Sequence, residues 1–257
     1  MKKVFFIIPA ACMFALTLIV SMHAAENNPA GAQLATHHYT VKRAGSPITV
    51  DGRLDEPLWS KAEPVSFVKK NGGQPEQATK AWVVWDDSYI YFAWDCEDSH
   101  IWSTMEKRDE PLYNEEVVEV FISADGDNTS YLEIEVNPLG TLWDGYIVNT
   151  VKRRVGILAW NSTGLKWAVH LDGTLNDREE TDKGWSVEMA LPLNDIFTAP
   201  NKPPKAGDRW RINLYRIDLP DGPGNPGEPC AWSPVSGETF HDPDRFGEIV
   251  FSAEVVR

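Results

Sequence analysis

The sequence predicts an all-β fold, namely an antiparallel β-sandwich of jelly-roll type with one or two short helical turns. Many short segments alternate between apolar and polar residues, which is the period of a half-buried strand. Turn residues separate these segments at short intervals, and no connection is long enough for the helices of a parallel α/β fold. About 230 residues remain behind the predicted leader, enough for one large all-β domain.

The amino terminus has the order of residues found in a secretory signal peptide. Two lysines open the chain, an apolar run extends to Val20, and small residues lead to residue 25. We therefore expect residues 1–25 to be removed and the protein to be exported, either to a periplasm or out of the cell. Residues 26–38 are small and polar and are predicted to be disordered, so the domain is expected at 39–257. No later stretch is apolar enough to span a membrane.

The elements follow from alternation and turn signals. Ile48–Val50 is predicted as a short strand and Leu54–Trp59 as a helical turn, and Leu193–Phe197 is expected to add another turn. Residues 220–229 contain four prolines and three glycines and are expected to be a loop. The other predicted strands are Ala78–Trp85, Ser88–Asp95, Thr141–Asn149, Lys166–Leu171, Gly184–Pro192, Arg209–Ile217 and Phe246–Phe251.

The segment Tyr113–Asn137 is predicted to form two strands joined by a polar loop. Alternation places Glu119 on the same face as Glu135 and Asn137, with Tyr113 at the entrance to that face. The opposite face is apolar and is expected to join the core. A row of carboxylate and amide groups beside an aromatic ring suits a polyhydroxylated ligand, and it is equally typical of an ordinary solvent-facing sheet.

The charge of the chain excludes several classes of partner. The formal charge is −14, and it becomes −16 once the predicted signal peptide and its two lysines are removed. Such a surface repels the phosphates of nucleic acids and of anionic lipids, so neither is an expected partner. No Gly-rich phosphate loop is present, and no nucleotide cofactor is expected. Cys96 and Cys230 remain after cleavage and form either a disulfide or two free thiols.

Six segments, taken in order, form a recognisable set. They are I-T-V-D-G-R-L-D-E-P-L-W at 48–59, W-D-D-S-Y-I-Y-F-A-W-D-C-E-D at 85–98, E-E-V-V-E-V-F-I-S at 115–123, G-W-S-V-E-M-A-L-P at 184–192, W-R-I-N-L-Y-R-I-D at 210–218 and F-H-D-P-D-R-F-G-E-I-V-F at 240–251. Together they resemble the family 9 carbohydrate-binding modules, and in particular an exported family-9-like group. The resemblance implies a β-sandwich that binds sugars, commonly at the ends of glucan or xylan chains. Such modules are usually attached to glycoside hydrolases, whereas here the module is expected to be essentially the whole protein, without a catalytic domain.

The resemblance also implies which residues contact the sugar. The family clamps its ligand between two aromatic side chains, and Tyr113 and Phe240 occupy those positions here. Glu119 matches a strand glutamate that accepts hydrogen bonds from sugar hydroxyls, and Asn137 matches a polar contact position.

Two positions depart from the family pattern. Glu135 stands where the family has an arginine, and Tyr215 stands where it has a glutamine. The sugar preference of the family is therefore not expected to transfer unchanged. Arg216 and His241 are further candidates for hydrogen bonds to sugar hydroxyls.

The resemblance implies structural calcium, and it leaves haem conceivable. The run Asp125–Asn128 clusters oxygen atoms as a calcium site does, but it lacks the EF-hand order and also fits a simple turn. Related sandwiches hold haem through Met and His, and Met105 with His100 or His170 is the conceivable pair. No haem is expected.

Two other functions remain open. The sandwich is alternatively a structural or interaction module that has lost sugar binding. Glycoside hydrolysis requires two carboxylates at a defined separation, and Glu119 with Glu133 or Glu135 would supply such a pair.

Overall fold

The strands in residues 37–149 and 153–256, the part of the chain that this computed structural model describes, join into one continuous hydrogen-bonded path. Its order is β10-β11-β5-β4-β1-β14-β12-β6-β7-β8-β9, and the short β2, β3 and β13 attach at its sides. The strands are β1 His38–Ala44, β2 Val65–Ser66, β3 Val68–Lys69, β4 Thr79–Trp85, β5 Tyr89–Glu97, β6 Val117–Ser123, β7 Ser130–Val136, β8 Leu142–Asn149, β9 Arg154–Ile157, β10 Lys166–Asp172, β11 Gly184–Pro192, β12 Arg209–Asp218, β13 Glu228–Ala231 and β14 Gly247–Val256. Three short 3-10 turns are η1 Leu112–Asn114, η2 Leu193–Asp195 and η3 Pro243–Arg245.

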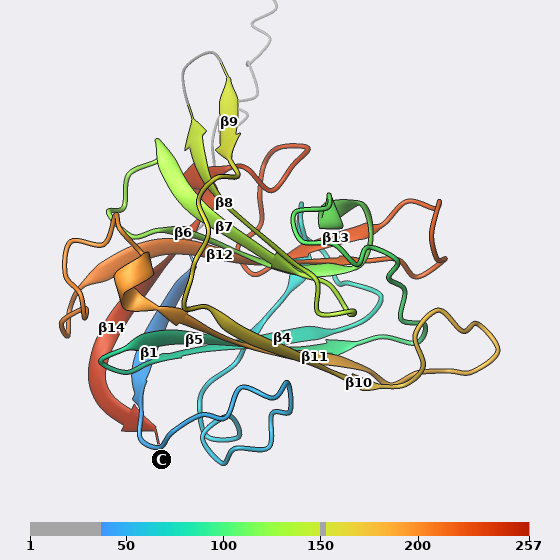
Figure 1. The fold of residues 1–257 in the computed structure, drawn as a ribbon, viewed down its shortest axis with the longest axis horizontal. Helices are drawn as coiled ribbons and strands as arrows, with labels where there is room; N and C mark the ends of the chain where they lie inside the picture. The colour runs from blue at the N-terminus through green and yellow to red at the C-terminus, as the bar shows by residue number, and fades with distance from the viewer. Residues whose placement is uncertain (1–36, 150–152, 257) are drawn as a thin grey trace, which may run out of the picture. The chain divides into compact units, whose positions relative to one another are not determined.

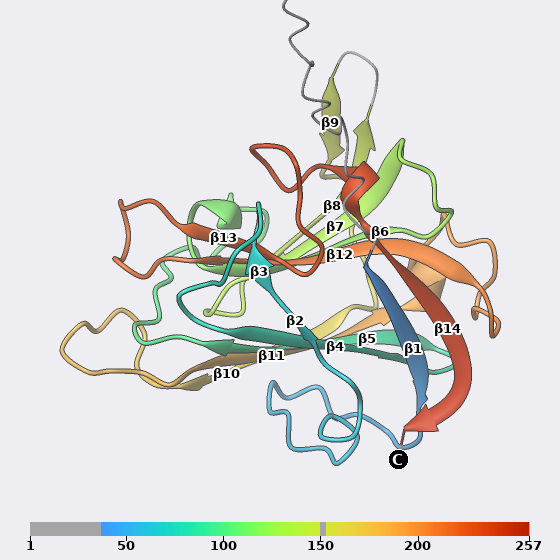
Figure 2. The same ribbon diagram turned by 180° about the vertical axis from the view of Figure 1, so that it is seen from behind.

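The path bends into the two layers of a β-sandwich (Figures 1 and 2). One layer contains β10, β11, β5 and β4, and the other contains β12, β6, β7 and β8. The strands β1 and β14 connect the layers, and β1 pairs in parallel with both β14 and β4. The other pairings are antiparallel, so the predicted fold class is confirmed.

The main core lies between the two layers. Alternate residues of β6 and β7 point into it, where they meet the aromatic side chains of the other layer. The inward residues of these strands are Val118, Val120, Ile122, Leu132, Ile134 and Val136. Cys96 and Cys230 are buried in the same core as free thiols, so no disulfide joins them, and burial raises the pKa of each thiol to about 12.

The outer face of β6, β7 and β8 is also buried, which the alternation alone did not predict. A second apolar cluster covers it and includes residues of the loops around η1 and η3, such as Leu112, Phe240 and Phe246. Glu119 and Glu135 on this face are 2% and 0% exposed. The predicted polar, solvent-facing side of the sheet is therefore an interior surface.

One predicted strand is wrong, and its backbone shows why. Ile48–Val50 is irregular because carboxylates, rather than a neighbouring strand, satisfy the local N–H groups. The N–H of Thr49 donates to Glu56 Oε1 at 2.9 Å, and those of Asp51 and Gly52 donate to Glu188 Oε2 at 3.0 Å.

Other boundaries shift by less. The predicted turn at Leu54–Trp59 is an isolated hydrogen-bonded turn rather than a helix, whereas η2 lies within the turn predicted at Leu193–Phe197. β13 starts inside the expected loop 220–229 because it pairs with both β12 and β3.

The start of the domain lies slightly earlier than predicted. β1 begins at His38, and His37 already accepts a hydrogen bond from the N–H of Glu248 at 2.7 Å, so these two residues are not disordered. The predicted signal peptide lies outside the described residues. Within the described part, no helix has the length and apolar character needed to cross a membrane.

Candidate functional site

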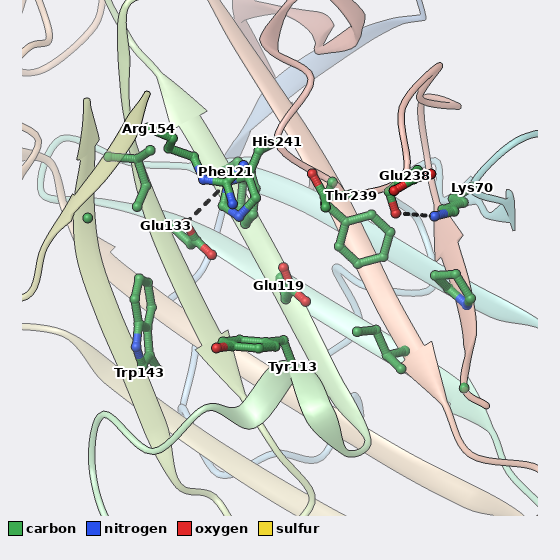
Figure 3. Close-up of a pocket in the computed structure, with 16 residues that line it drawn as sticks. Lys70, Tyr113, Glu119, Phe121, Glu133, Trp143, Arg154, Glu238, Thr239 and His241 are labelled. Carbon is green, nitrogen blue, oxygen red and sulfur yellow. Dashed lines mark hydrogen bonds and ion pairs between the residues drawn. The ribbon is translucent and has the colours of Figure 1, made fainter. Parts of the chain in front are cut away.

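A pocket of about 590 Å³ opens on the outer face of the β12–β6–β7–β8 layer. Figure 3 shows Glu119 at its centre, between Tyr113 on one side and Phe121 with His241 on the other. The lining residues come from four strands of this layer, from β9, β13 and η1, and from three loops: Lys70, Tyr113, Glu119, Phe121, Glu133, Trp143, Ile147, Arg154, Gly156, Ile217, Gly227, Pro229, Glu238, Thr239, Phe240 and His241.

Aromatic rings form much of the pocket wall. Tyr113 lies in η1 and is 53% exposed, so its ring is free to contact a ligand. Phe240 is held by Tyr215: the two rings stack at 4.1 Å between centroids, and the Tyr215 hydroxyl donates to the Phe240 carbonyl at 2.9 Å. Tyr215 is fully buried behind the wall and supports Phe240 rather than contacting a ligand itself.

Trp143 supplies a third aromatic wall because Gly145 leaves room for its ring. A Cβ at Gly145 would lie 2.8 Å from Trp143 Cη2, closer than side chains tolerate. Glu133 faces Gly145 across the strand pair, so the tryptophan ring lies beside the carboxylates. An exposed wall and a supported wall of this kind suit the C–H faces of a ring-shaped ligand.

Glu119 and Glu133 line the pocket, and strand register places the buried Glu135 beside them. Glu119 of β6 lies directly opposite Glu135 of β7, and Glu133 is two residues away on the same face. One carboxylate oxygen from each lies within 4.8 Å of the other two. Like charges directly opposite each other destabilise a sheet, so this arrangement is costly without a compensating partner.

The three carboxyl groups are held away from water. Burial raises the pKa of Glu119 and of Glu135 well above the ordinary value; repulsion from Glu133 adds to this for Glu119, and repulsion from Glu119 and Glu133 adds to it for Glu135. Burial likewise raises the pKa of Glu133 to about 8, against the lowering effects of a hydrogen bond with Glu135 and of Arg154. Burial therefore favours the protonated form of each of these carboxyl groups.

His241 lies at the upper end of the pocket and is uncharged at neutral pH. Burial, assisted by Arg154, lowers its pKa to about 3. Its Nδ1 lies 2.7 Å from the Tyr131 hydroxyl and 3.8 Å from Glu133 Oε2. Because the imidazole is neutral, the contact with Glu133 is not an ion pair.

Four predicted contact residues do not line the pocket: Glu135 and Tyr215 lie on its face of the sheet but are fully buried, and Asn137 and Arg216 are directed elsewhere. Asn137 is wholly buried, where its Nδ2 donates to the Met105 carbonyl at 2.8 Å and its Oδ1 accepts from the N–H of Thr141 at 2.8 Å. Both ends of its amide are occupied in fixing the turn before β8. Arg216 points into the main core because Tyr215, its neighbour in β12, occupies the pocket face.

Arg216 neutralises a second group of buried acids inside the sandwich. Its Nη2 lies 3.0 Å from Asp98 Oδ2 and 3.1 Å from Asp218 Oδ1, and its Nη1 donates to the Glu97 carbonyl at 2.7 Å. Glu116 completes the group. A guanidinium already occupies this cluster, so these acids do not fit calcium.

The run Asp125–Asn128, which fits either a calcium loop or a simple turn, contains internal hydrogen bonds. Asp127 accepts from the N–H of Thr129 at 2.8 Å and from that of Ser130 at 3.3 Å, and these bonds lower its pKa against the effect of burial. Asp125 accepts from Ser123 Oγ at 3.2 Å. Two groups of described carboxylates have a spacing that fits a single cation, and Glu119, Glu133 and Glu135 are the group that contains no guanidinium.

Several lining residues were not singled out from the sequence as contact residues. Glu133 and Phe121 share the predicted face with Glu119, so the alternation contained that signal. Lys70, Trp143 and Arg154 come from distant segments that only the fold brings together, and no local pattern marks them.

Comparison with known proteins identifies the family. The model of the family described as carbohydrate family 9 binding domain-like matches residues 50–253. Endo-1,4-beta-xylanase A of Thermoanaerobacterium saccharolyticum is 28% identical over 228 residues, which are 87% of this chain and 16% of the xylanase. An extracellular protein of Arthroderma benhamiae is 25% identical over 169 residues, 65% of this chain and 69% of that protein. The chain spans about one sixth of the length of the xylanase.

A solved relative has the same fold. A family 9 carbohydrate-binding module from Caldicellulosiruptor kristjanssonii, in complex with cellotriose, superposes with a TM-score of 0.58 at 16% identity, covering 84% of this chain and 94% of the module. The complex of a family 9 module from the same organism with glucose gives a TM-score of 0.57. At this identity the likeness establishes the fold.

Proposed function

The chain belongs to the carbohydrate family 9 binding domain-like proteins, and from that premise we propose that its ligand is a glycan bound in the pocket above Glu119. The observation that carries this proposal is the pocket itself, in which an exposed Tyr113 and a supported Phe240 stand beside buried carboxyl groups. Aromatic rings pack against the C–H faces of pyranoses, while carboxyl groups exchange hydrogen bonds with hydroxyls. No step of bond cleavage is part of the proposal.

The relatives support a glucan or xylan as the ligand class. One solved family 9 module was obtained with cellotriose and another with glucose, and the most extended match above is to a xylanase. The extracellular relative and the predicted signal peptide support export to a periplasm or to the outside of the cell. The same pocket would serve the uptake or breakdown of polysaccharide by presenting chains to other proteins.

Titration of the purified domain with cellotriose and xylotriose, followed by calorimetry, tests the proposal. Tyr113→Ala removes the exposed wall and is expected to weaken binding about tenfold, consistent with about 1.4 kcal/mol. Phe197→Ala is the matched control, because Phe197 is 48% exposed and packs on Tyr146 outside the pocket. Equal losses in both variants would refute the proposed site.

Hydrolysis is the less favoured use of the same carboxyl groups. A glycoside hydrolase needs one carboxylate ionised and the other protonated, whereas burial raises the pKa of all three glutamates here. We expect no reducing ends to be released from cello- or xylo-oligosaccharides. Release that Glu119→Gln abolishes would establish a hydrolase instead.

A further inference from the structure

The described residues include two buried groups of three acids, which differ in whether a cation neutralises them. Inside the sandwich, Asp98, Glu116 and Asp218 surround Arg216, whose guanidinium forms two ion pairs with them. In the pocket, Glu119, Glu133 and Glu135 have no such partner. Lys70 and Arg154, the cationic side chains among the described lining residues, form no ion pair with these three, although Arg154 lowers the pKa of Glu133.

Two oxygens at the pocket wall also lack hydrogen-bond partners. Oε1 of Glu119 and Oε2 of Glu133 are buried without a partner, whereas Glu135 interacts with Glu133 and with the backbone of Tyr113. Glu119 and Glu133 are 2% and 4% exposed, and both line the open pocket. Unpaired buried acceptors are costly, and an arrangement that keeps two of them beside a cavity points to a donor that arrives with the ligand.

We propose that this donor is the protonated amine of an amino sugar, so that the pocket prefers glycans with free amino groups over neutral ones. The inference rests on the proposed function and names its ligand class. An –NH3⁺ group has three N–H donors and no acceptor. Three acceptors about 2.8 Å from one tetrahedral nitrogen lie about 4.6 Å apart, which matches carboxylate oxygens that lie within 4.8 Å of one another.

The walls favour a sugar-borne cation over a bare metal ion. Calcium takes six to eight oxygen ligands and gains nothing from aromatic rings. An amino sugar uses both parts of the pocket, because its ring faces Tyr113 and Phe240 while its amine reaches Glu119 and Glu133. The amine then supplies the positive charge that Arg216 supplies to the other group.

Binding of a cation in this pocket is linked to proton release. The carboxyl groups of the empty pocket have raised pKa values, and a positive charge beside them favours their ionised form. We expect about one proton to leave per bound ligand at neutral pH. The titratable or charged groups that face the three glutamates are Tyr131, Arg154, Tyr215 and His241.

Three trisaccharides of one backbone test the proposal: the fully deacetylated glucosamine trimer, cellotriose and the N-acetylated trimer. They differ in the group at C2, which is an ammonium, a hydroxyl or an acetamide. By calorimetry at low ionic strength, we expect the amine to bind at least about tenfold more tightly than the other two. Its heat should change with the ionisation enthalpy of the buffer, whereas that of cellotriose should not.

Variants and controls separate the outcomes. Glu135→Gln should remove the preference for the amine while cellotriose still binds, and Glu116→Gln, a buried acid outside the pocket, should keep the preference. Equal affinity for the amine and cellotriose overturns the inference and leaves the proposed function standing. If none of the three trisaccharides binds, both the inference and the proposed function are overturned. A rise in Tm with calcium chloride that Glu135→Gln lacks would assign the glutamates to a metal instead.

Discussion

At the scale of single residues, the pocket depends on a glycine that no binding pattern marks. Trp143 can form a wall only because Gly145 has no Cβ, and an added methyl group would lie 2.8 Å from the indole ring. Gly145→Ala should displace that ring and weaken glycan binding several-fold while costing about 1–3 kcal/mol of stability through overpacking. Gly237→Ala is the control, since its nearest neighbour would be 3.9 Å away. Calorimetric titration of both variants gives the comparison, and unchanged affinity in Gly145→Ala would show that Trp143 is not a contact.

The same scale shows how far residue patterns reach. Alternation correctly places Glu119 and Glu135 on one face, because strand period alone decides this. It also puts Asn137 there, but both ends of that amide are consumed by Met105 and Thr141. Whether a polar side chain contacts a ligand or a loop depends on which distant segments of the chain pack over it. The sequence of the strand itself does not contain that information.

At the scale of elements, consecutive residues of β12 face opposite sides of the sheet and do different work there. Tyr215 supports the pocket wall, and the next residue, Arg216, neutralises acids in the core. Arg216→Met should therefore cost about 3–5 kcal/mol of unfolding free energy, because Asp98 and Asp218 would be left buried without a counter-charge. The folded fraction should bind glycan with unchanged affinity. Urea denaturation measures the stability and glycan titration measures the affinity. A variant that is stable but binds glycan more weakly would show that Arg216 contributes to binding instead.

Strands were predicted correctly where one of their faces packs into the core. The prediction failed where backbone groups form hydrogen bonds with partners other than a neighbouring strand. The hairpin β4–β5 and strand β11 follow their alternation closely. Ile48–Val50 has the composition of a strand, yet the backbone N–H groups in and just after it donate to the carboxylates of Glu56 and Glu188 rather than to a neighbouring strand. Proline-rich residues 220–229 gave no sign of β13, whose pairing with β3 is a long-range contact.

At the scale of the whole molecule, buried acids should make the ligand-free protein less stable as pH rises. Burial raises the pKa of Glu188 to about 7, of Glu133 to about 8 and of Glu116 to about 10. In the unfolded chain these groups ionise near their ordinary value of about 4.3, while in the folded chain they stay protonated. Unfolding therefore releases protons throughout this window, and stability present at low pH is lost progressively up to the folded pKa values.

Urea denaturation at about pH 5.5 and about pH 7.5 should show at least about 2 kcal/mol less stability at the higher value, since one pKa unit corresponds to about 1.4 kcal/mol. Glu135→Gln removes one of three mutually repelling carboxyl groups, so it should reduce this difference and stabilise the protein at the higher pH. A saturating cationic glycan should have the same effect on the wild-type chain, because it stabilises the ionised glutamates in the folded state. Stability that stays constant or increases with pH would mean that these acids are not held protonated, and the pocket would then need a permanent counter-ion.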